Sequence, residues 1–172
     1  MSQVLHSPHA ESIVNALQCQ GNRNDCAPYT VATIVSAFSG SIVDGSTLAE
    51  QMNKPVWRGI IPVIRRIPNW ATFPWGMVDV LKDHGFSAHW GIRYTTDYLR
   101  MSVQKGNLPI PVIGSWRPLW GHVMTLVAWD ESGYWGFANT QMNEKKIDWK
   151  TQDYFITHWN VYSRLCVEVN LS

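Results

Sequence analysis

Three residues of this sequence are of the types that thiol catalysis uses, and they occur in the order Cys26, His122 and Asn139. A thiol nucleophile has to lose its proton, needs a base within hydrogen-bond reach, and needs a third group that orients the base. Cys26 opens a segment with helical apolar spacing, and the free N–H groups at a helix N-terminus favour a thiolate. Cys19 precedes a loop and Cys166 lies in an alternating segment, so neither has this position. Cys26 is therefore the candidate nucleophile.

His122 is the candidate base, because it begins an apolar run of strand length after a glycine. Residues 122–129 and 134–139 are both predicted strands, and residues 130–133 are typical of a hairpin turn between them. In such a hairpin the start of the first strand lies beside the end of the second. We therefore expect Asn139 near His122, where an amide oxygen can accept from the imidazole N–H and fix its tautomer.

The segment around Cys26 carries the start and stop signals of a helix. Asp25 can act as the N-cap, Pro28 lies in the first turn, where its missing N–H costs nothing, and Gly40 supplies the stop. We predict a buried helix that opens at or just before Cys26. Its apolar residues at helical spacing are Val31, Ile34, Val35 and Phe38.

In the other segments the spacing of apolar residues indicates helices in the first part of the chain and mostly strands in the second. Residues 53–73 contain three prolines and few periodic cues, so we expect a long irregular crossing there. Helices are predicted at 46–52, with Thr47 and Glu50 as a capping box, at 73–84, at 96–104 with Thr96 as cap, and at 151–158. Further strands are predicted at 86–92, 109–116 and 161–169. Helices first and antiparallel strands afterwards indicate an α+β fold in a single domain of residues 1–172.

The composition is that of a globular protein and excludes several partners. Of the 172 residues 45% are hydrophobic and 16% are charged, and the formal net charge is +1. The dispersed basic residues predict no nucleic-acid partner. The sequence contains no run of about 18 uncharged apolar residues, so we predict no membrane span. We expect no metal site, because His84 and His89 lack a third ligand at suitable spacing and are typical of solvated loop histidines.

The three cysteines and the first residues bear on the compartment. An odd cysteine count does not fit a disulfide framework, and we expect Cys19 and Cys166 to be buried thiols. The first residues lack a basic stretch followed by an apolar one. If Met1 is the native start, a cytoplasmic location is expected, and if a leader was removed, an extracellular one.

Several segments of the chain resemble a known family. Residues 20–26 (Gln-Gly-Asn-Arg-Asn-Asp-Cys) resemble the glutamine-loop-cysteine segment of papain-like cysteine peptidases. Residues 25–29 (Asp-Cys-Ala-Pro-Tyr) more closely resemble the branch that contains the bacteriocin-processing, double-glycine leader peptidases. Residues 121–130 are similar to the histidine strand of that branch, residues 133–140 to its strand ending in the orienting Asp or Asn, and residues 154–159 to its closing helix. This chain departs from the branch in having Ala27 where Gly is usual.

The resemblance implies a papain-like fold, in which an N-terminal helical part carrying the nucleophile packs on a C-terminal antiparallel sheet. It implies that Gln20 and the Cys26 backbone N–H hold the oxyanion. It also implies that His122 protonates the leaving amine, that water releases the acyl enzyme, and that no cofactor takes part. The expected partner is a peptide or protein substrate, and the sequence leaves the oligomeric state open.

The predicted function is hydrolysis of a peptide or isopeptide bond through an acyl-thioester on Cys26. Two alternatives remain open: an acyltransferase or transglutaminase-like enzyme on the same scaffold, and a catalytically inactive peptide-binding module, which Ala27 weakly favours. Trp120 and Trp116 flank three residues just before His122. They either line the cleft as an apolar subsite or belong to the core, where most of the ten tryptophans are expected.

Overall fold

Helix α2 (Cys26–Ser39) begins at the candidate nucleophile and runs through the interior of the molecule. The protein is described by a computed structural model, which covers residues 3–171. Gly40, with a φ of 71°, ends α2 in the left-handed conformation that glycine adopts without steric cost. The predicted start and stop of this helix are confirmed. Met1, on which the predicted location depends, lies outside the described residues.

Two further helices begin with caps that differ from the predicted ones. The Asp44 carboxylate caps α3 (Gly45–Met52) by accepting from the Thr47 N–H at 2.8 Å, so the predicted capping box is wrong. Helix α5 (Thr96–Gln104) is capped by Thr95, one residue earlier than predicted. In both cases the residue just outside the helix has extended backbone, which lets its side chain turn back onto a free N–H. The remaining helices are α1 (Ala10–Asn15), α4 (Pro74–Asp83) and α6 (Gln152–Val161).

Two four-stranded antiparallel sheets form the centre of the described chain. The first has the order β1-β9-β10-β11, and the second the order β6-β12-β7-β8. The strands of the first sheet are β1 (Val4–His6), β9 (Thr125–Asp130), β10 (Tyr134–Ala138) and β11 (Asp148–Thr151). Those of the second are β6 (Ser87–Gly91), β12 (Cys166–Asn170), β7 (Leu108–Trp116) and β8 (Leu119–Val123).

The strand predicted at 122–129 is divided between the two sheets. The chain leaves β8 after Val123 and enters β9 at Thr125, so that β8 pairs with β7 and β9 pairs with β10. The predicted 161–169 strand is also too long, because α6 continues to Val161 and the next residues turn, with φ of 55° at Ser163 and 54° at Arg164. The predicted hairpin between β9 and β10 is present.

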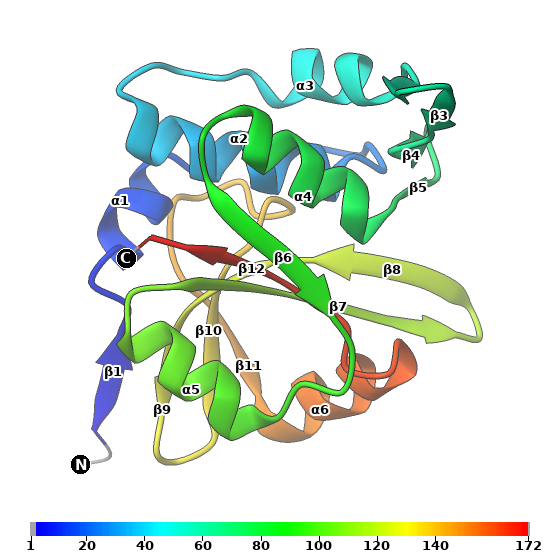
Figure 1. Ribbon diagram of the computed structural model, residues 1–172. Helices are drawn as coiled ribbons and strands as arrows, with labels where there is room; N and C mark the ends of the chain where they lie inside the picture. The colour runs from blue at the N-terminus through cyan, green and yellow to red at the C-terminus, as the bar shows by residue number, and fades with distance from the viewer. Residues whose placement is uncertain (1–2, 172) are drawn as a thin grey trace.

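Residues 53–73 are more regular than the predicted irregular crossing. They form two short antiparallel hairpins that lie at one corner of the molecule (Figure 1). A backbone hydrogen bond of 3.0 Å from Phe73 N–H to the Arg65 carbonyl ties the end of this segment to its middle. The strands are β2 (Val56–Arg58), β3 (Ile61–Val63), β4 (Arg66–Ile67) and β5 (Ala71–Thr72).

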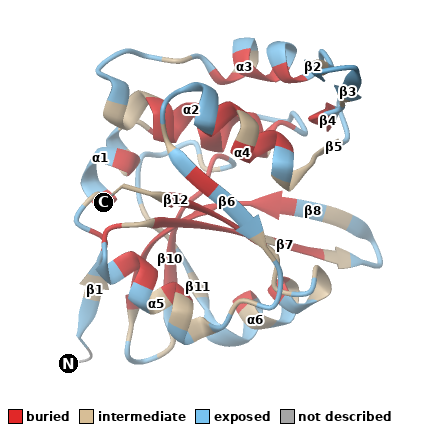
Figure 2. Cartoon of the chain, in the orientation of Figure 1, coloured by how far each residue is buried: buried red, intermediate tan, exposed pale blue. Residues whose placement is uncertain are grey.

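Helices cover the sheets from two sides, with α2, α3 and α4 on one side and α5 and α6 on the other (Figure 1). Two apolar clusters follow from this arrangement: one joins α1, α2 and α4 to the strands, and the other joins α5 and α6 to β9 and β10 (Figure 2). The mixed α+β class is confirmed. The expectation of a mostly buried tryptophan set is wrong, because only Trp129, Trp135 and Trp159 are buried.

Helices long and apolar enough to cross a membrane are not found in residues 3–171. Within the same residues, no group of three His, Cys, Asp or Glu side chains has the proximity that a metal ion requires. His84 and His89, which were expected to be solvated histidines, have exposed side chains: the His84 ring contacts the Val80 carbonyl at 2.9 Å, and His89 lies 3.6 Å from the Glu168 carboxylate.

Candidate active site

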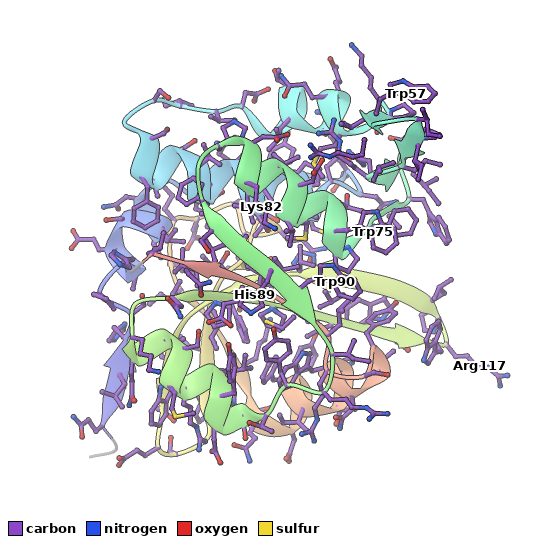
Figure 3. All side chains as sticks on the ribbon, in the orientation of Figure 1. Trp57, Trp75, Lys82, His89, Trp90 and Arg117 are labelled. Atoms are coloured by element: carbon purple, nitrogen blue, oxygen red, sulfur yellow. The ribbon has the colours of Figure 1, made fainter. Side chains whose placement is uncertain are left out.

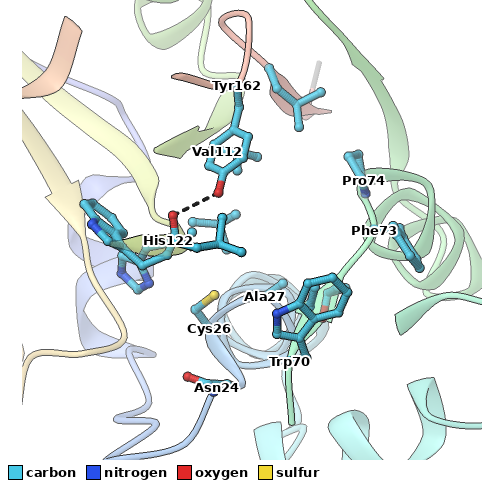
Figure 4. Close-up of a pocket in the computed structure, with 16 residues that line it drawn as sticks. Asn24, Cys26, Ala27, Trp70, Phe73, Pro74, Val112, His122 and Tyr162 are labelled. Atoms are coloured by element: carbon cyan, nitrogen blue, oxygen red, sulfur yellow. Dashed lines mark hydrogen bonds between the residues drawn. The ribbon is translucent and has the colours of Figure 1, made fainter. Parts of the chain in front are cut away.

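A cavity of about 410 Å³ lies at the N-terminal end of α2 (Figure 4). Cys26 and His122 both line it, so the helix start and the strand β8 bring the candidate nucleophile and base into one space. No Asp, Glu, Lys or Arg side chain contributes to its lining, which is mostly apolar. The other lining residues are Asn24, Ala27, Trp70, Ala71, Thr72, Phe73, Pro74, Val112, Leu119, Trp120, Gly121, Val123, Tyr162 and Leu165.

The pKa of the Cys26 thiol is raised, whereas the helix N-terminus predicted a lowered one. Burial of the thiol raises its pKa above the ordinary value, because the thiolate loses water. Backbone hydrogen bonds from Val123 and Ala27 and the positive charge of Arg66 lower the pKa, but they do not outweigh burial. The lowering of the thiol pKa that the helix N-terminus predicted is therefore not found, and the proposed chemistry relies on a base that takes the thiol proton.

His122 is oriented by Asn139, as the hairpin argument predicted. The two side chains are buried, and His122 Nε2 lies 2.7 Å from Asn139 Oδ1. Two other contacts fix which end of the amide faces the ring: Oδ1 accepts from the Gln141 backbone N–H at 3.0 Å, and Nδ2 donates to the Asp148 carboxylate at 2.7 Å. Because Oδ1 can only accept, Nε2 carries the proton and Nδ1 is left free to act as a base.

Asp148 is a site residue that sequence reasoning missed. It begins β11, and its carboxylate accepts from Asn139 and also pairs with Lys150 at 3.1 Å. The short stretch that forms β11 has no clear period, and β11 itself was not predicted. The place of Asp148 in the site therefore becomes evident only from the pairing of β11 with β10, which brings Asp148 opposite Phe137.

Asp25 holds the start of α2 by a contact different from the predicted helix cap. Its side chain makes no cap hydrogen bond; its carboxylate instead accepts from Arg66 at 2.6 Å, in a pair with both side chains buried. Arg66 also donates weakly to the carbonyls of Asn24 and Ala49, at 3.4 and 3.5 Å. This buried pair ties the residue before Cys26 to β4, and sequence reasoning did not single out Arg66.

Gln20, the predicted oxyanion donor, is buried but does not line the cavity. Its side-chain amide donates to the Arg23 carbonyl at 2.6 Å and accepts from the Thr140 hydroxyl at 2.6 Å. Its backbone N–H donates to the Thr140 carbonyl at 2.8 Å. These contacts join the loop before Cys26 to the residue after Asn139, and the role of Gln20 as an oxyanion donor stays a prediction.

The two predicted subsite tryptophans occupy different places. Trp120 lines the cavity, and its backbone carbonyl accepts from the Tyr162 hydroxyl at 2.9 Å (Figure 4). Trp116 is exposed and packs edge-on against Tyr162, with ring centroids 5.4 Å apart, but it does not line the cavity. Ala27 lines the cavity as well, so its methyl group borders the space beside the thiol.

The three cysteines are all free, in three different environments. Cys166 is buried, as predicted, but Cys19 is exposed, which corrects the expectation of a buried thiol. Cys19 lies in the loop before α2, where its sulfur donates to Asn143 at 3.1 Å. Cys26 is partly buried and is the one that shares a cavity with a histidine.

Comparison with solved structures identifies the fold. The described chain matches the crystal structure of a "putative C39-like peptidase" from Bacillus anthracis with a TM-score of 0.70, over 100% of this chain and 98% of that one. The protein has a C39-like peptidase fold. At 13% sequence identity the likeness concerns the fold alone. Neither a protein-family model nor a curated protein matches the sequence.

On this C39-like fold, the arrangement at the cavity is suited to thiol chemistry. Cys26 lies at the amide end of a helix, and His122, which lines the same cavity, carries its proton on Nε2, the nitrogen that Asn139 holds. Such an imidazole can accept the thiol proton as an attack begins and return it to a leaving group. The mostly apolar walls would receive uncharged groups.

We expect the pKa of His122 to lie below its usual value of 6.5. Burial lowers it because the imidazolium loses water, while the Asn139 hydrogen bond and the Asp148 charge raise it in part. The neutral base therefore persists below pH 6.5 and is lost only as the pH falls through this lowered value. Because Asp148 favours the imidazolium, Asp148→Asn should lower the His122 pKa further. NMR titration of the ring tests both expectations, and a midpoint above 6.5, or a rise on Asp148→Asn, contradicts them.

Replacing Asn139 by Ala should slow the reaction without abolishing it. The lost contact is a hydrogen bond to an imidazole that becomes charged, worth about 1.5–3 kcal/mol, which corresponds to about 10- to 150-fold in kcat. KM should change little, because Asn139 does not line the cavity. Steady-state kinetics on any cleaved peptide measures the split. Thr30→Val is the matched control, because Thr30 is buried, does not line the cavity, and its hydroxyl has no hydrogen-bond partner among the described residues. An equal loss of kcat there would contradict the role of Asn139.

Proposed function

We propose that the chain is a papain-like cysteine peptidase that hydrolyses a peptide or isopeptide bond through an acyl-thioester on Cys26. The observation that carries this proposal is the hydrogen bond of 2.7 Å between His122 and Asn139, in a cavity that Cys26 also lines. It leaves a basic imidazole nitrogen on the ring that shares a cavity with the thiol. The C39-like fold supports the proposal, and residues 1–172 would act as one domain.

The proposed reaction has two steps. In the first, Nδ1 of His122 takes the Cys26 proton as the sulfur attacks the carbonyl carbon, and the oxyanion forms beside the Cys26 backbone N–H; Gln20 adds a second donor if its amide leaves the Arg23 carbonyl. The imidazolium then gives its proton to the amine, the C–N bond breaks, and a thioester remains. In the second step His122 takes a proton from water, the hydroxide attacks the thioester, and the thiolate leaves with the proton from His122.

Digestion of a mixed peptide library, read by mass spectrometry, tests the reaction class. A peptidase yields new termini and a transient acyl adduct on Cys26, and neither appears with Cys26→Ala. A labelled primary amine added to the digest distinguishes transfer from hydrolysis, since a transferase yields products that carry the label. Retention of library peptides by the wild type, without cleavage or label, would contradict the proposal and support the binding module.

A further inference from the structure

Two hairpins project large apolar side chains into solvent. At the β2–β3 hairpin the exposed fractions are 67% for Trp57, 93% for Ile60 and 63% for Ile61. At the β7–β8 hairpin Trp116 is 63% exposed and Leu119 is exposed to a similar extent. These side chains lie at or near the tips of the hairpins and remain largely exposed, although Trp116 packs on Tyr162. Large apolar side chains exposed in groups at two hairpins indicate an interaction site.

Aromatic rings connect the region between these hairpins with the cavity. Phe73, which lines the cavity, stacks on Trp75 with ring centroids 4.4 Å apart, and Trp75 lies 6.2 Å from Trp90. Trp75 also donates its indole N–H to the Ile64 carbonyl at 2.9 Å, which fixes the first hairpin segment against α4. Figure 3 shows Trp57, Trp75, Trp90 and Arg117 along one side of the molecule. We call the exposed set the tryptophan face: Trp57, Ile60, Ile61, Trp70, Trp75, Trp90, Trp116, Arg117 and Leu119.

The hairpin segments that carry the tryptophan face contain basic residues and no acidic ones. The sequence contains no Asp or Glu in residues 51–78, which form the first two hairpins, or in residues 98–129, which include the other. Each tip has an arginine directly after its tryptophan, Arg58 and Arg117, and both arginines are exposed. The Arg58 guanidinium pairs with Asp79 on α4 and is still half exposed. Apart from this paired Asp79, the tips combine apolar side chains with cationic ones.

We propose that the tryptophan face docks the protein on an anionic lipid bilayer. Tryptophan is favoured at the boundary of membrane and water, where its ring is apolar and its N–H stays wet, and isoleucine tips gain by entering the acyl region. The exposed arginines are attracted to anionic headgroups, and the two hairpin segments contain no acidic residue that would repel them, although Asp79 offsets part of the Arg58 charge. Two separated, projecting tips can both reach a flat surface, with the cavity opening between them.

Docking in this orientation has a consequence for the cavity. Trp70 and Leu119 belong to the tryptophan face and also line the cavity. The rim of the cavity would then lie next to the lipid surface, and the substrate would be a polypeptide segment held at that surface. The docking itself depends on neither Cys26 nor His122.

Vesicle sedimentation with the full chain tests the docking. Wild type should bind vesicles of phosphatidylcholine with phosphatidylglycerol, bind phosphatidylcholine alone more weakly, and lose binding as salt rises. The Ile60→Asp/Ile61→Asp double variant should lower the partition coefficient by about tenfold or more. Ile42→Asp is the matched control: Ile42 is 89% exposed, and it lies in the loop between α2 and α3, away from the β2–β3 corner (Figure 1). This variant and Cys26→Ser should bind as wild type does.

Three results would overturn the docking proposal. The first is no binding of wild type to either vesicle, or an equal loss in Ile42→Asp. The second is that wild type does not bind vesicles and Ile60→Asp/Ile61→Asp raises KM for soluble peptides. This result would assign the tryptophan face to binding of a polypeptide. The third is a dimer in sedimentation velocity that the double variant dissociates, which assigns it to a second copy. Unchanged vesicle binding by Cys26→Ser keeps this test separate from the proposed reaction.

Discussion

The Cys26→Ser and His122→Ala variants are each expected to lose at least about a thousandfold in kcat/KM for any peptide that the wild type cleaves. A serine hydroxyl is much harder to ionise than a thiol, and the cavity already disfavours the anion, since burial raises the pKa of Cys26. Without His122, no other histidine lines the cavity to take up that proton. Initial rates of product formation, measured by mass spectrometry or a fluorogenic peptide, give the ratio.

Two comparisons make this prediction specific. The Cys26→Ser/His122→Ala double variant should be no slower than the worse single variant, because the two residues act as one unit. His84→Ala should keep wild-type activity, since His84 is exposed, does not line the cavity, and its ring makes a hydrogen bond to the Val80 carbonyl of its own helix. If His122→Ala retained most of the activity, or if His84→Ala lost it, the assignment of the base would be wrong.

Replacing Arg66 by Met is expected to have the largest effect on stability. The change leaves the Asp25 carboxylate buried without its partner, at a cost of about 3–5 kcal/mol in the free energy of unfolding. Arg58→Met is the matched control, because the Arg58–Asp79 pair is half exposed and its loss should cost about 1 kcal/mol or less. Urea unfolding followed by tryptophan fluorescence measures both values.

The double variant Asp25→Asn/Arg66→Met tests whether the loss of stability in Arg66→Met comes from the unpaired Asp25 charge. Removing the orphaned charge should restore part of the lost stability, since the penalty comes mainly from an unpaired buried carboxylate. Equal destabilisation in Arg58→Met and Arg66→Met would contradict the distinction between the exposed and buried pairs. A double variant less stable than Arg66→Met would contradict the origin of the penalty.

The parts of the fold that repeat a local pattern could be predicted from the sequence. Helix α2 follows from its apolar spacing and from Gly40, and the β9–β10 hairpin follows from two apolar runs around a turn. Placing Asn139 beside His122 required only that hairpin, because antiparallel pairing brings the two ends together. These inferences depend on residues close in sequence, where period and turn residues determine the local backbone.

The parts that depend on distant pairing could not be predicted. The apolar run from 122 to 129 changes sheets at Met124, and nothing in its composition marks the change. Strands β1 and β11 are short, and each is stabilised by a neighbouring strand rather than by its own period. Asp148 and Arg66 enter the site through such pairings, across 9 and 41 residues of sequence separation respectively. The pKa of Cys26 was mispredicted because burial, a tertiary property, outweighed the helix terminus.

The alkylation of Cys26 and Cys19 by iodoacetamide at pH 6, measured site by site by mass spectrometry, tests the central claim most directly. Cys19 is exposed and Cys26 is partly buried, so access alone would favour Cys19. If His122 removes the Cys26 proton, Cys26 reacts faster than Cys19, and His122→Ala abolishes that advantage while His84→Ala keeps it. Faster labelling of Cys19, or a Cys26 rate indifferent to His122, would contradict the account.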